Sequence, residues 1–338
     1  MHRTRVGVIG AGVMGTAYAS AMTSGTLAWR CELVGIADTN PDAAHNLAGR
    51  VGCAAYNSPD DLLSQAHPDA VYIAVPDRLH LAPFLTAAHH GVAILVEKPL
   101  ATTLEDALAM QEAARAAHVV ARVNFSNRFN PPFVRAREAI DRGDLGEVIG
   151  VSARLSNVID YPTKHLRWAD RTTCGWFLLS HLFDLVRWLA GAEADRVTAA
   201  GVKRRLASMG LDTYDLIHAL VEYEGGLSGA YESAWVLPPS LPSLVDCNVQ
   251  IVGTDGRALI DTHSQTVHIA TQQHLSYPAT LDWTDASITS FLDAADLGVP
   301  VPPEQLADGV ENTRLLVALH QSLETGAPVP VVREPAQQ

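Results

Sequence analysis

The chain has few cysteines, and none of them lie close together in the sequence. Its 338 residues contain four, which are Cys31, Cys53, Cys174 and Cys247. The lack of C-x-x-C spacing argues against a zinc site and against a disulfide framework, and scattered cysteines suit a reducing compartment. We therefore expect a cytoplasmic protein that binds no metal.

Long apolar runs and an excess of positive charge are also missing. No stretch reaches the roughly 18 apolar residues of a membrane-spanning helix, and the apolar run behind the basic N-terminus is too short for a signal peptide. Lysine and arginine number 24 against 37 aspartates and glutamates, so the formal net charge is −13. We therefore expect neither a nucleic acid nor a membrane as a partner.

Lysine itself is rare. The chain contains only Lys98, Lys164 and Lys203, and arginine supplies nearly all of the positive charge. A lysine in this chain is therefore more indicative of a specific role than a lysine in a lysine-rich protein.

A glycine-rich turn, Gly-Ala-Gly-Val-Met-Gly, occupies residues 10–15, between a short apolar run and a helical pattern. The order of strand, G-x-G-x-x-G and helix is typical of a dinucleotide site. Gly10 permits the tight turn, Gly12 lets the backbone approach a pyrophosphate, and Gly15 lets helix and strand pack closely, while the helix N-terminus offers N–H groups to the anion. A turn of purely structural origin is the alternative. The cofactor contacts expected here are Gly10, Gly12, Val13, Met14 and Gly15.

Asp38 is a second sign of a dinucleotide. It ends the next apolar run, 23 residues after Gly15, where an acid accepts hydrogen bonds from the adenosine ribose hydroxyls. A carboxylate would repel a 2′-phosphate, and the following Thr-Asn-Pro supplies no arginine to neutralise one. The sequence therefore favours NAD over NADP.

The pattern along the chain predicts two domains. Residues 1–124 alternate strand and helix, which predicts six strands in a doubly wound parallel sheet. Residues 125–338 contain longer strand-like segments, with helices expected at 176–189, 287–297 and 303–324, which predicts an antiparallel or mixed sheet. We therefore expect an α/β protein, with an NAD(P)-binding Rossmann domain over 1–124 and a C-terminal α+β domain over 125–338.

Two places are candidates for chemistry. Lys98 lies at the carboxyl end of the fifth strand, where the nicotinamide half of a dinucleotide should bind, and burial could bring its pKa toward neutrality for proton transfer. The alternative is a solvated surface lysine. His181 and Asp184 lie three residues apart on the helix expected at 176–189 and so share one face. The histidine is either a core residue or an oriented acid/base, and these two interpretations stay open.

These residues resemble the Gfo/Idh/MocA oxidoreductases, the family of glucose–fructose oxidoreductase and inositol dehydrogenase. The strongest matches are Glu97-Lys98-Pro99 and the segment from Val75 to His80, which is similar to the family's T-P-N-x-x-H. Other matches are the turn at 10–15, the segments 127–131 and 143–146, the pair His181 and Asp184, and Ser290-Phe291.

The resemblance implies a Rossmann domain followed by a domain whose open sheet mediates homodimers or homotetramers. It implies hydride transfer between nicotinamide and a secondary alcohol or ketone of a sugar, polyol or related compound. His181 would be the general acid/base, and Lys98 would polarise the substrate or relay the proton. The added cofactor contacts would be Val75, Pro76, His80, Glu97 and Lys98.

Phe177 departs from the family pattern, because polyol-oxidising members often carry an aspartate four residues before the histidine. Trp176 and Phe177 either pack on the substrate or are core residues, and Lys164 either binds substrate or lies on a solvated loop. The expected substrate contacts are Lys98, Asn127, Arg128, Lys164, Trp176, Phe177, His181 and Asp184.

Two rival functions remain. The first is an NAD-dependent glycosidase, in which transient oxidation activates a sugar for elimination. The second is a protein that senses a dinucleotide or a sugar without turnover. Phe177 favours the sensor, whereas Lys98 and His181 oppose it.

Overall fold

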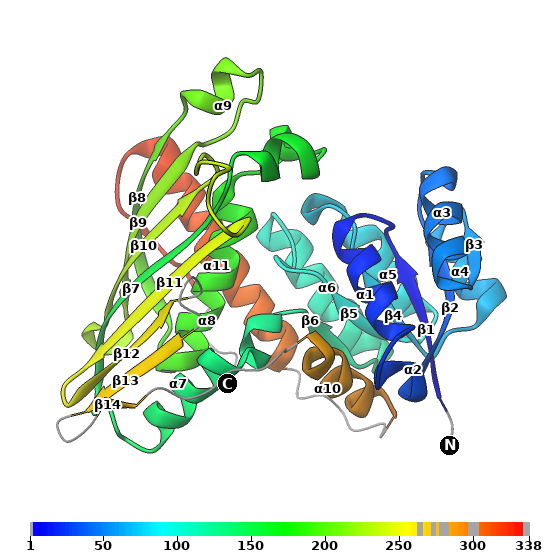
Figure 1. Cartoon of the computed structure of the whole chain (residues 1–338), viewed down its shortest axis with the longest axis horizontal. Helices are drawn as coiled ribbons and strands as arrows, with labels where there is room; N and C mark the ends of the chain where they lie inside the picture. The colour runs from blue at the N-terminus through cyan, green and yellow to red at the C-terminus, as the bar shows by residue number, and fades with distance from the viewer. Residues whose placement is uncertain (1–2, 262–265, 272–274, 277–283, 297–303, 334–338) are drawn as a thin grey trace. The chain divides into compact units, whose positions relative to one another are not determined.

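The computed structural model describes residues 3–261, 266–271, 275–276, 284–296 and 304–333 (Figure 1). It divides into two compact units, which we describe separately. Unit 1 consists of Met1–Ser126 and Trp283–Thr313, and unit 2 of Asn127–Asp282 and Arg314–Gln338.

Unit 1 is built on a six-stranded parallel sheet in the order β3-β2-β1-β4-β5-β6. The prediction of a doubly wound parallel sheet is thereby confirmed. The strands are β1 (Thr4–Ile9), β2 (Cys31–Ala37), β3 (Ala54–Tyr56), β4 (Ala70–Ile73), β5 (Ala93–Val96) and β6 (Ala121–Val123). The helices are α1 (Val13–Met22), α2 (Leu27–Arg30), α3 (Pro41–Val51), α4 (Pro59–Ala66), α5 (Leu81–His89), α6 (Leu104–Ala117) and α10 (Thr284–Asp296), with the 3₁₀ turn η1 (Asp77–Leu79).

Side-chain caps set where three of these helices begin. The side chain of Asn40 accepts hydrogen bonds from two backbone N–H groups of α3, Ser58 accepts one in α4, and Thr103 accepts one in α6. Proline follows the cap in α3 and α4, where its missing N–H costs no helical hydrogen bond. These caps fix the short connections that place each strand end at one edge of the sheet.

The last part of the chain returns to unit 1, which the sequence analysis did not anticipate when it assigned residues 125–338 to one domain. Ile288, Phe291 and Leu292 of α10 are buried in the same apolar cluster as β1 and β2. Gly309 of α11 (Glu304–Thr325) lies so close to β6 that a Cβ there would come 2.6 Å from a methyl group of Val123. Side chains of α10 and of the N-terminal part of α11 therefore complete the core of unit 1, and α11 contributes to both units.

Unit 2 is built on a nine-stranded sheet in the order β14-β13-β12-β11-β7-β10-β9-β8-β15. The central strands β7 and β10 pair in parallel, and the other pairs are antiparallel, as the predicted mixed sheet requires. The strands are β7 (Val148–Asn157), β8 (Ala194–Val202), β9 (Leu216–Tyr223), β10 (Ser228–Ala234), β11 (Val245–Gly253), β12 (Gly256–Asp261), β13 (Thr266–Thr271), β14 (Leu275–Ser276) and β15 (Val329–Pro330).

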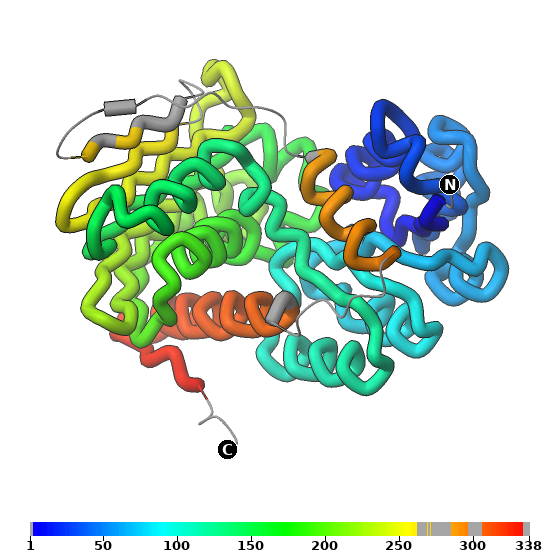
Figure 2. Tube along the Cα trace, turned by 90° about the horizontal axis from the view of Figure 1, so that it is seen from below, coloured from blue at the N-terminus to red at the C-terminus, as the bar shows by residue number. Residues whose placement is uncertain are grey.

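Helices pack on one face of this sheet. They are α7 (Pro131–Asp141), α8 (Ser180–Ala190) and the C-terminal part of α11 (Figure 2). Their apolar side chains share one cluster with the inward side chains of the strands. The shorter turns are η2 (Ser126–Phe129), η3 (Tyr161–His165), η4 (Ala169–Arg171), η5 (Gly175–Leu179), α9 (Arg205–Ser208) and η6 (Glu224–Gly226). On the other face, alternate side chains of β9 such as Leu220 are exposed. No helix in the described part of the chain is long and apolar enough to cross a membrane.

Candidate functional site

The glycine-rich turn between β1 and α1 has the geometry of an anion site. Gly10 has φ +105°, and a Cβ there would lie 2.4 Å from the carbonyl oxygen of Ala74. A Cβ on Gly15 would lie 1.8 Å from the Gly10 carbonyl oxygen, whereas a Cβ on Gly12 would meet nothing within 4 Å. No side chain caps α1 at Gly12, and the side chains of Val13 and Met14 are exposed. The N–H groups at this helix start therefore face open space, as a pyrophosphate requires.

Asp38 follows β2 and is held against this turn. One carboxylate oxygen accepts a hydrogen bond from the Ala11 backbone N–H at 2.8 Å, and the other accepts one from the Asn40 N–H at 2.8 Å. The remaining lone pairs of the two oxygens can accept hydrogen bonds from ribose hydroxyls. The open turn and the oriented carboxylate together fit NAD and disfavour a 2′-phosphate.

Lys98 is the second residue after β5 and is 9% exposed. Burial lowers the pKa of its ammonium group, while the neighbouring carboxylates of Glu97 and Asp77 act in the opposite direction. The peptide bond between Lys98 and Pro99 is cis. The lysine is therefore not a solvated surface residue, and its proton affinity is reduced in the way that a proton-transferring lysine requires.

Glu97, expected at the cofactor, has its side chain directed into the interior of unit 1, where it is 5% exposed. One carboxylate oxygen accepts hydrogen bonds from the Tyr72 hydroxyl and, at 2.6 Å, from the Asn124 side-chain amide. The other accepts one from the Lys98 backbone N–H at 3.3 Å. The structure thus gives Glu97 partners within the protein on both oxygens.

His80, also expected at the cofactor, is buried between two loops. Its Nε2 lies 3.1 Å from the carbonyl oxygen of Val75, and its Nδ1 lies 2.9 Å from that of Pro99 and 3.1 Å from that of Leu100. The ring therefore links the segment after β4, where Val75 and Pro76 are half-buried, to the segment that follows Lys98. These contacts are all with backbone carbonyl oxygens, so the ring bridges the two segments.

In unit 2, the structure brings together the residues expected around His181. The Asn127 side-chain nitrogen lies 3.4 Å from Nδ1 of His181. Arg128 donates two hydrogen bonds to the two carboxylate oxygens of Asp184, at 2.9 and 2.5 Å. The side chains of Arg128 and Asp184 are 19% and 2% exposed, so this fork-shaped pair is largely shielded from water.

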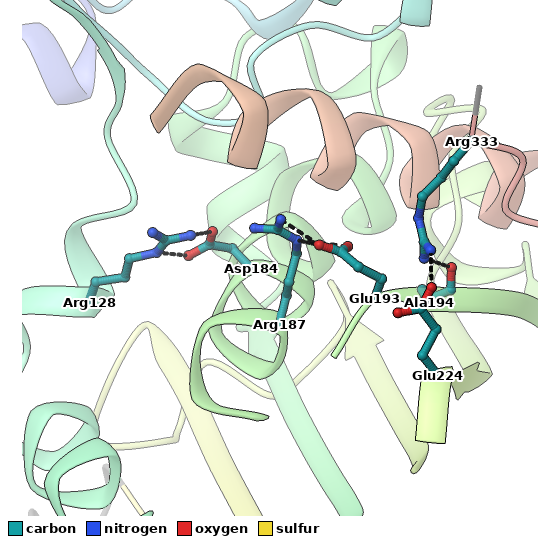
Figure 3. Close-up of polar contacts among 7 residues, drawn as sticks. All are labelled: Arg128, Asp184, Arg187, Glu193, Ala194, Glu224 and Arg333. Atoms are coloured by element: carbon teal, nitrogen blue, oxygen red, sulfur yellow. Dashed lines mark hydrogen bonds and ion pairs between the residues drawn. The ribbon is translucent and has the colours of Figure 1, made fainter. Parts of the chain in front are cut away.

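Figure 3 shows a second ion pair beside the Arg128–Asp184 pair. It joins Arg187 to Glu193, and both pairs belong to unit 2. Asp184 and Arg187 both lie on α8, one turn apart. The helix that carries His181 is thus tied to its surroundings by charged contacts at two positions, Asp184 and Arg187.

The helix that carries His181 differs from the expected continuous helix over 176–189. Residues Gly175–Leu179 form a π-helical turn, and α8 begins at Ser180. In the wider turn, residues four apart no longer lie directly above one another as they do in an α-helix. Phe177 and His181 are therefore not placed on one helix face as the sequence pattern predicted. Phe177 packs with its ring centroid 5.5 Å from Tyr161, 6.0 Å from Trp168 and 5.8 Å from Trp235. These contacts favour the core interpretation of Phe177.

Trp176 and Lys164 likewise have partners within unit 2. The Trp176 ring stacks on His320 of α11 with centroids 4.5 Å apart and an interplanar angle of 11°. The Lys164 ammonium lies 2.8 Å from the Asp160 carboxylate on an exposed turn. The structure therefore agrees with the solvated alternative for Lys164.

Sequence reasoning missed the side chains that surround Glu97. They are Tyr18, Tyr72, Asn124 and Ser287, which come from four different parts of the chain. The position of Asn124 directly after a buried strand, beside the end of β5, was the one available signal. Among the residues that the structure describes, no cluster of histidine, cysteine or acidic side chains could hold a metal ion.

Two family models match the chain. One is described as "Oxidoreductase family, NAD-binding Rossmann fold" and matches residues 4–125. The other is described as "GFO/IDH/MocA C-terminal domain" and matches residues 133–259. Together they span most of unit 1 and most of the unit 2 sheet.

Curated relatives and solved structures agree with these matches. The scyllo-inositol 2-dehydrogenase (NAD(+)) of Bacillus subtilis (strain 168) is 28% identical over 267 residues, which are 77% of this chain and 75% of that protein. Inositol 2-dehydrogenase 3 of Saccharopolyspora erythraea is 28% identical over 337 residues, which are 97% and 95% of the two chains. The structure of levoglucosan dehydrogenase with NADH has a TM-score of 0.85 at 22% identity, over 98% of this chain and 100% of that one, which shows a shared fold.

Proposed function

Because this chain belongs to the GFO/IDH/MocA family of NAD-binding oxidoreductases, we propose that it interconverts a secondary alcohol and a ketone of a polyol or sugar through Lys98 and His181. The observation that carries the proposal is the buried Lys98 at the carboxyl end of β5 in a sheet whose first turn fits a pyrophosphate. NAD is the cofactor, and when bound it supplies the hydride acceptor.

We assign the cofactor to unit 1. The N-terminus of α1, from Val13 to Gly15, would bind the pyrophosphate, and Asp38 would accept hydrogen bonds from the adenosine ribose. Val75 and Pro76 would line the path toward the end of β5. The side chains of His80 and Glu97 would act from within the protein, by fixing the backbone around Lys98.

Lys98 and His181 would divide the proton transfer. An alcohol hydroxyl must lose its proton as its carbon is oxidised, so an enzyme of this kind needs a base at the oxygen. The pKa of Lys98, lowered by burial, lets its amine accept or relay that proton. His181 would be the general acid/base, oriented by Asn127, and Arg128 with Asp184 would shape the substrate site in unit 2.

The test is the rate of NADH formation at 340 nm with NAD and with NADP, across a panel of inositols, sugars and glycosides. Lys98→Met and His181→Asn should abolish turnover on the substrate found. The matched controls are Lys203→Met and His89→Asn, which change the same residue types at exposed positions outside the predicted site and should leave turnover intact. Full activity in the Lys98 and His181 variants would refute the proposed roles.

The same panel separates the rival functions. Cleavage of a glycoside without net NADH formation would indicate the glycosidase. Clear NAD binding without turnover of any compound would indicate the sensor, and would be consistent with Phe177 at the position where many relatives carry an acid.

We also propose that the protein forms homo-oligomers in the cytoplasm. The open face of the unit 2 sheet supports this, because Leu220 is exposed there between Ala230 of β10 and Thr198 of β8. The four free cysteines suit a reducing compartment. Light scattering after size-exclusion chromatography tests the first proposal, with Leu220→Lys as the disrupting variant, and cell fractionation tests the second.

A further inference from the structure

A buried polar network lies directly behind Lys98 in unit 1. Its centre is the carboxylate of Glu97. One oxygen of this carboxylate accepts hydrogen bonds from the Tyr72 hydroxyl and from the Asn124 side-chain amide. The Asn124 amide also donates to the Tyr18 hydroxyl oxygen at 2.7 Å, and its carbonyl oxygen accepts from the Ser287 hydroxyl at 3.0 Å. All four polar atoms of Glu97 and Asn124 therefore have defined partners.

Three donors hold the Glu97 carboxylate in place. They are the Tyr72 hydroxyl, the Asn124 side-chain amide and the Lys98 backbone N–H. Tyr72 and Tyr18 stack with ring centroids 4.4 Å apart. Burial, together with the charge of Glu97, raises the pKa of both phenols, so neither gives up its proton near neutral pH.

The orientation of the Asn124 amide is fixed from the opposite side. Arg122 of β6 donates to the backbone oxygen of Ser287 at 2.7 Å and to the Ser290 hydroxyl at 3.0 Å. These contacts anchor α10 against β6, and α10 presents Ser287 to Asn124. Helix α10 thus helps to orient the Asn124 side-chain amide, which donates to Glu97.

We propose that Glu97 is a positioning residue that sets the proton affinity of Lys98, and that Tyr72 and Asn124 hold its carboxylate in place for that purpose. The inference rests on the proposed function, in which Lys98 exchanges a proton with the substrate. Two carboxylates, Glu97 on the same strand end and Asp77 on η1, act on the Lys98 ammonium. Glu97 also binds the Lys98 backbone N–H, so its charge and the lysine's position are coupled.

The direction in which Glu97→Gln shifts the titration midpoint of Lys98 distinguishes this role from a purely structural one. Glu97→Gln removes the charge and keeps the shape, so the ammonium form of Lys98 loses a favourable neighbour and its titration midpoint should fall by at least about one pH unit. If Glu97 only maintained packing, the variant would loosen the site and admit water. The midpoint would then rise toward that of an exposed lysine.

The measurement is an NMR titration of the whole chain carrying ¹³C at the lysine ε-carbons. The sequence has three lysines, and the spectrum of Lys98→Arg assigns the signal of Lys98 by its loss. Lys164 and Lys203 are exposed partners of Asp160 and Asp212, and they serve as internal references. Glu112→Gln, an exposed change of the same type on α6, is the control and should leave the Lys98 midpoint unchanged.

A fall of the Lys98 midpoint in Glu97→Gln, with the reference signals unmoved, supports the proposal. An unchanged or raised midpoint overturns it. If Glu97→Gln does not fold, Tyr72→Phe replaces it. This variant removes one of the donors that support the carboxylate, so the Lys98 midpoint should fall, by less than in Glu97→Gln, and an unchanged or raised midpoint overturns the proposal. The titration needs no substrate, so its outcome is independent of whether Lys98→Met abolishes turnover.

Discussion

His320 makes the stability of unit 2 sensitive to acid. Its Nδ1 lies 2.8 Å from the Leu316 carbonyl oxygen, its Nε2 lies 2.7 Å from the Thr173 hydroxyl, and its ring stacks on Trp176. The Trp176 backbone N–H in turn donates to the Thr173 oxygen at 3.2 Å. These contacts suit a neutral ring that donates from Nδ1 and accepts at Nε2.

Burial lowers the pKa of His320 from 6.5 to about 4. The folded value lies below the unfolded value, so the unfolded chain takes up a proton first as the pH falls. The stability that the neutral ring contributes is complete above about pH 6.5 and is lost progressively as the pH falls from about 6.5 to about 4. At pH 5 the loss should be about 2 kcal/mol, because each pKa unit corresponds to about 1.4 kcal/mol.

The assay compares urea unfolding of the parent chain and His320→Gln at pH 7.5 and pH 5.0. Glutamine can still pair with the Thr173 hydroxyl but does not titrate, so contributions from other histidines cancel in the double difference. We expect the parent to lose about 2 kcal/mol more than the variant between the two pH values. A double difference below about 0.5 kcal/mol, or one of opposite sign, would refute the reasoning.

Three further predictions concern the turn at residues 10–15, the acid after β2 and the ion pair in unit 2. Gly15→Ala should destabilise the chain by several kcal/mol in urea unfolding, because its Cβ would overlap the Gly10 carbonyl oxygen. Gly12→Ala, whose Cβ meets nothing within 4 Å, should change stability by less than about 1 kcal/mol and should weaken NAD binding. Asp38→Ala should weaken NAD and strengthen NADP in calorimetric titrations, since the repelling carboxylate is lost; an unchanged preference would contradict this role. Arg128→Met should cost about 3 kcal/mol of stability, and Asp184→Asn should cost less, because Arg128 is the more exposed partner.

Local signals in the sequence were sufficient for much of unit 1. The side chains of Asn40, Ser58 and Thr103 accept hydrogen bonds from N–H groups two or three positions further along the chain, so a few adjacent residues specify each cap. The parallel, doubly wound sheet followed from the alternation of strand and helix, whereas the order of its strands came from the structure. In unit 2 the sequence indicated a mixed sheet, and the parallel pairing of β7 with β10 became visible only in the structure.

The features that sequence reasoning missed depend on residues far apart in the chain. The pattern of α10 shows that one face is buried, but it does not show that Ile288 and Phe291 join the core of β1 and β2. The π-helical turn at Phe177 lies within an apolar stretch that also suits an α-helix. Glu97 was visible as part of a motif, but its partner Asn124 lies 27 residues away and the Ser287 that orients Asn124 lies 163 residues beyond it.

The way this chain uses lysine explains why position 98 matters. Lys164 and Lys203 form exposed ion pairs with Asp160 and Asp212, a role that arginine fills elsewhere on the surface. Lys98 alone among the three is buried, and its two carboxylate neighbours oppose the effect of burial on its pKa. Arginine cannot give up its proton in a protein, so a site that must exchange one needs lysine. The balance between desolvation and fixed negative charge then sets the pH at which the exchange takes place.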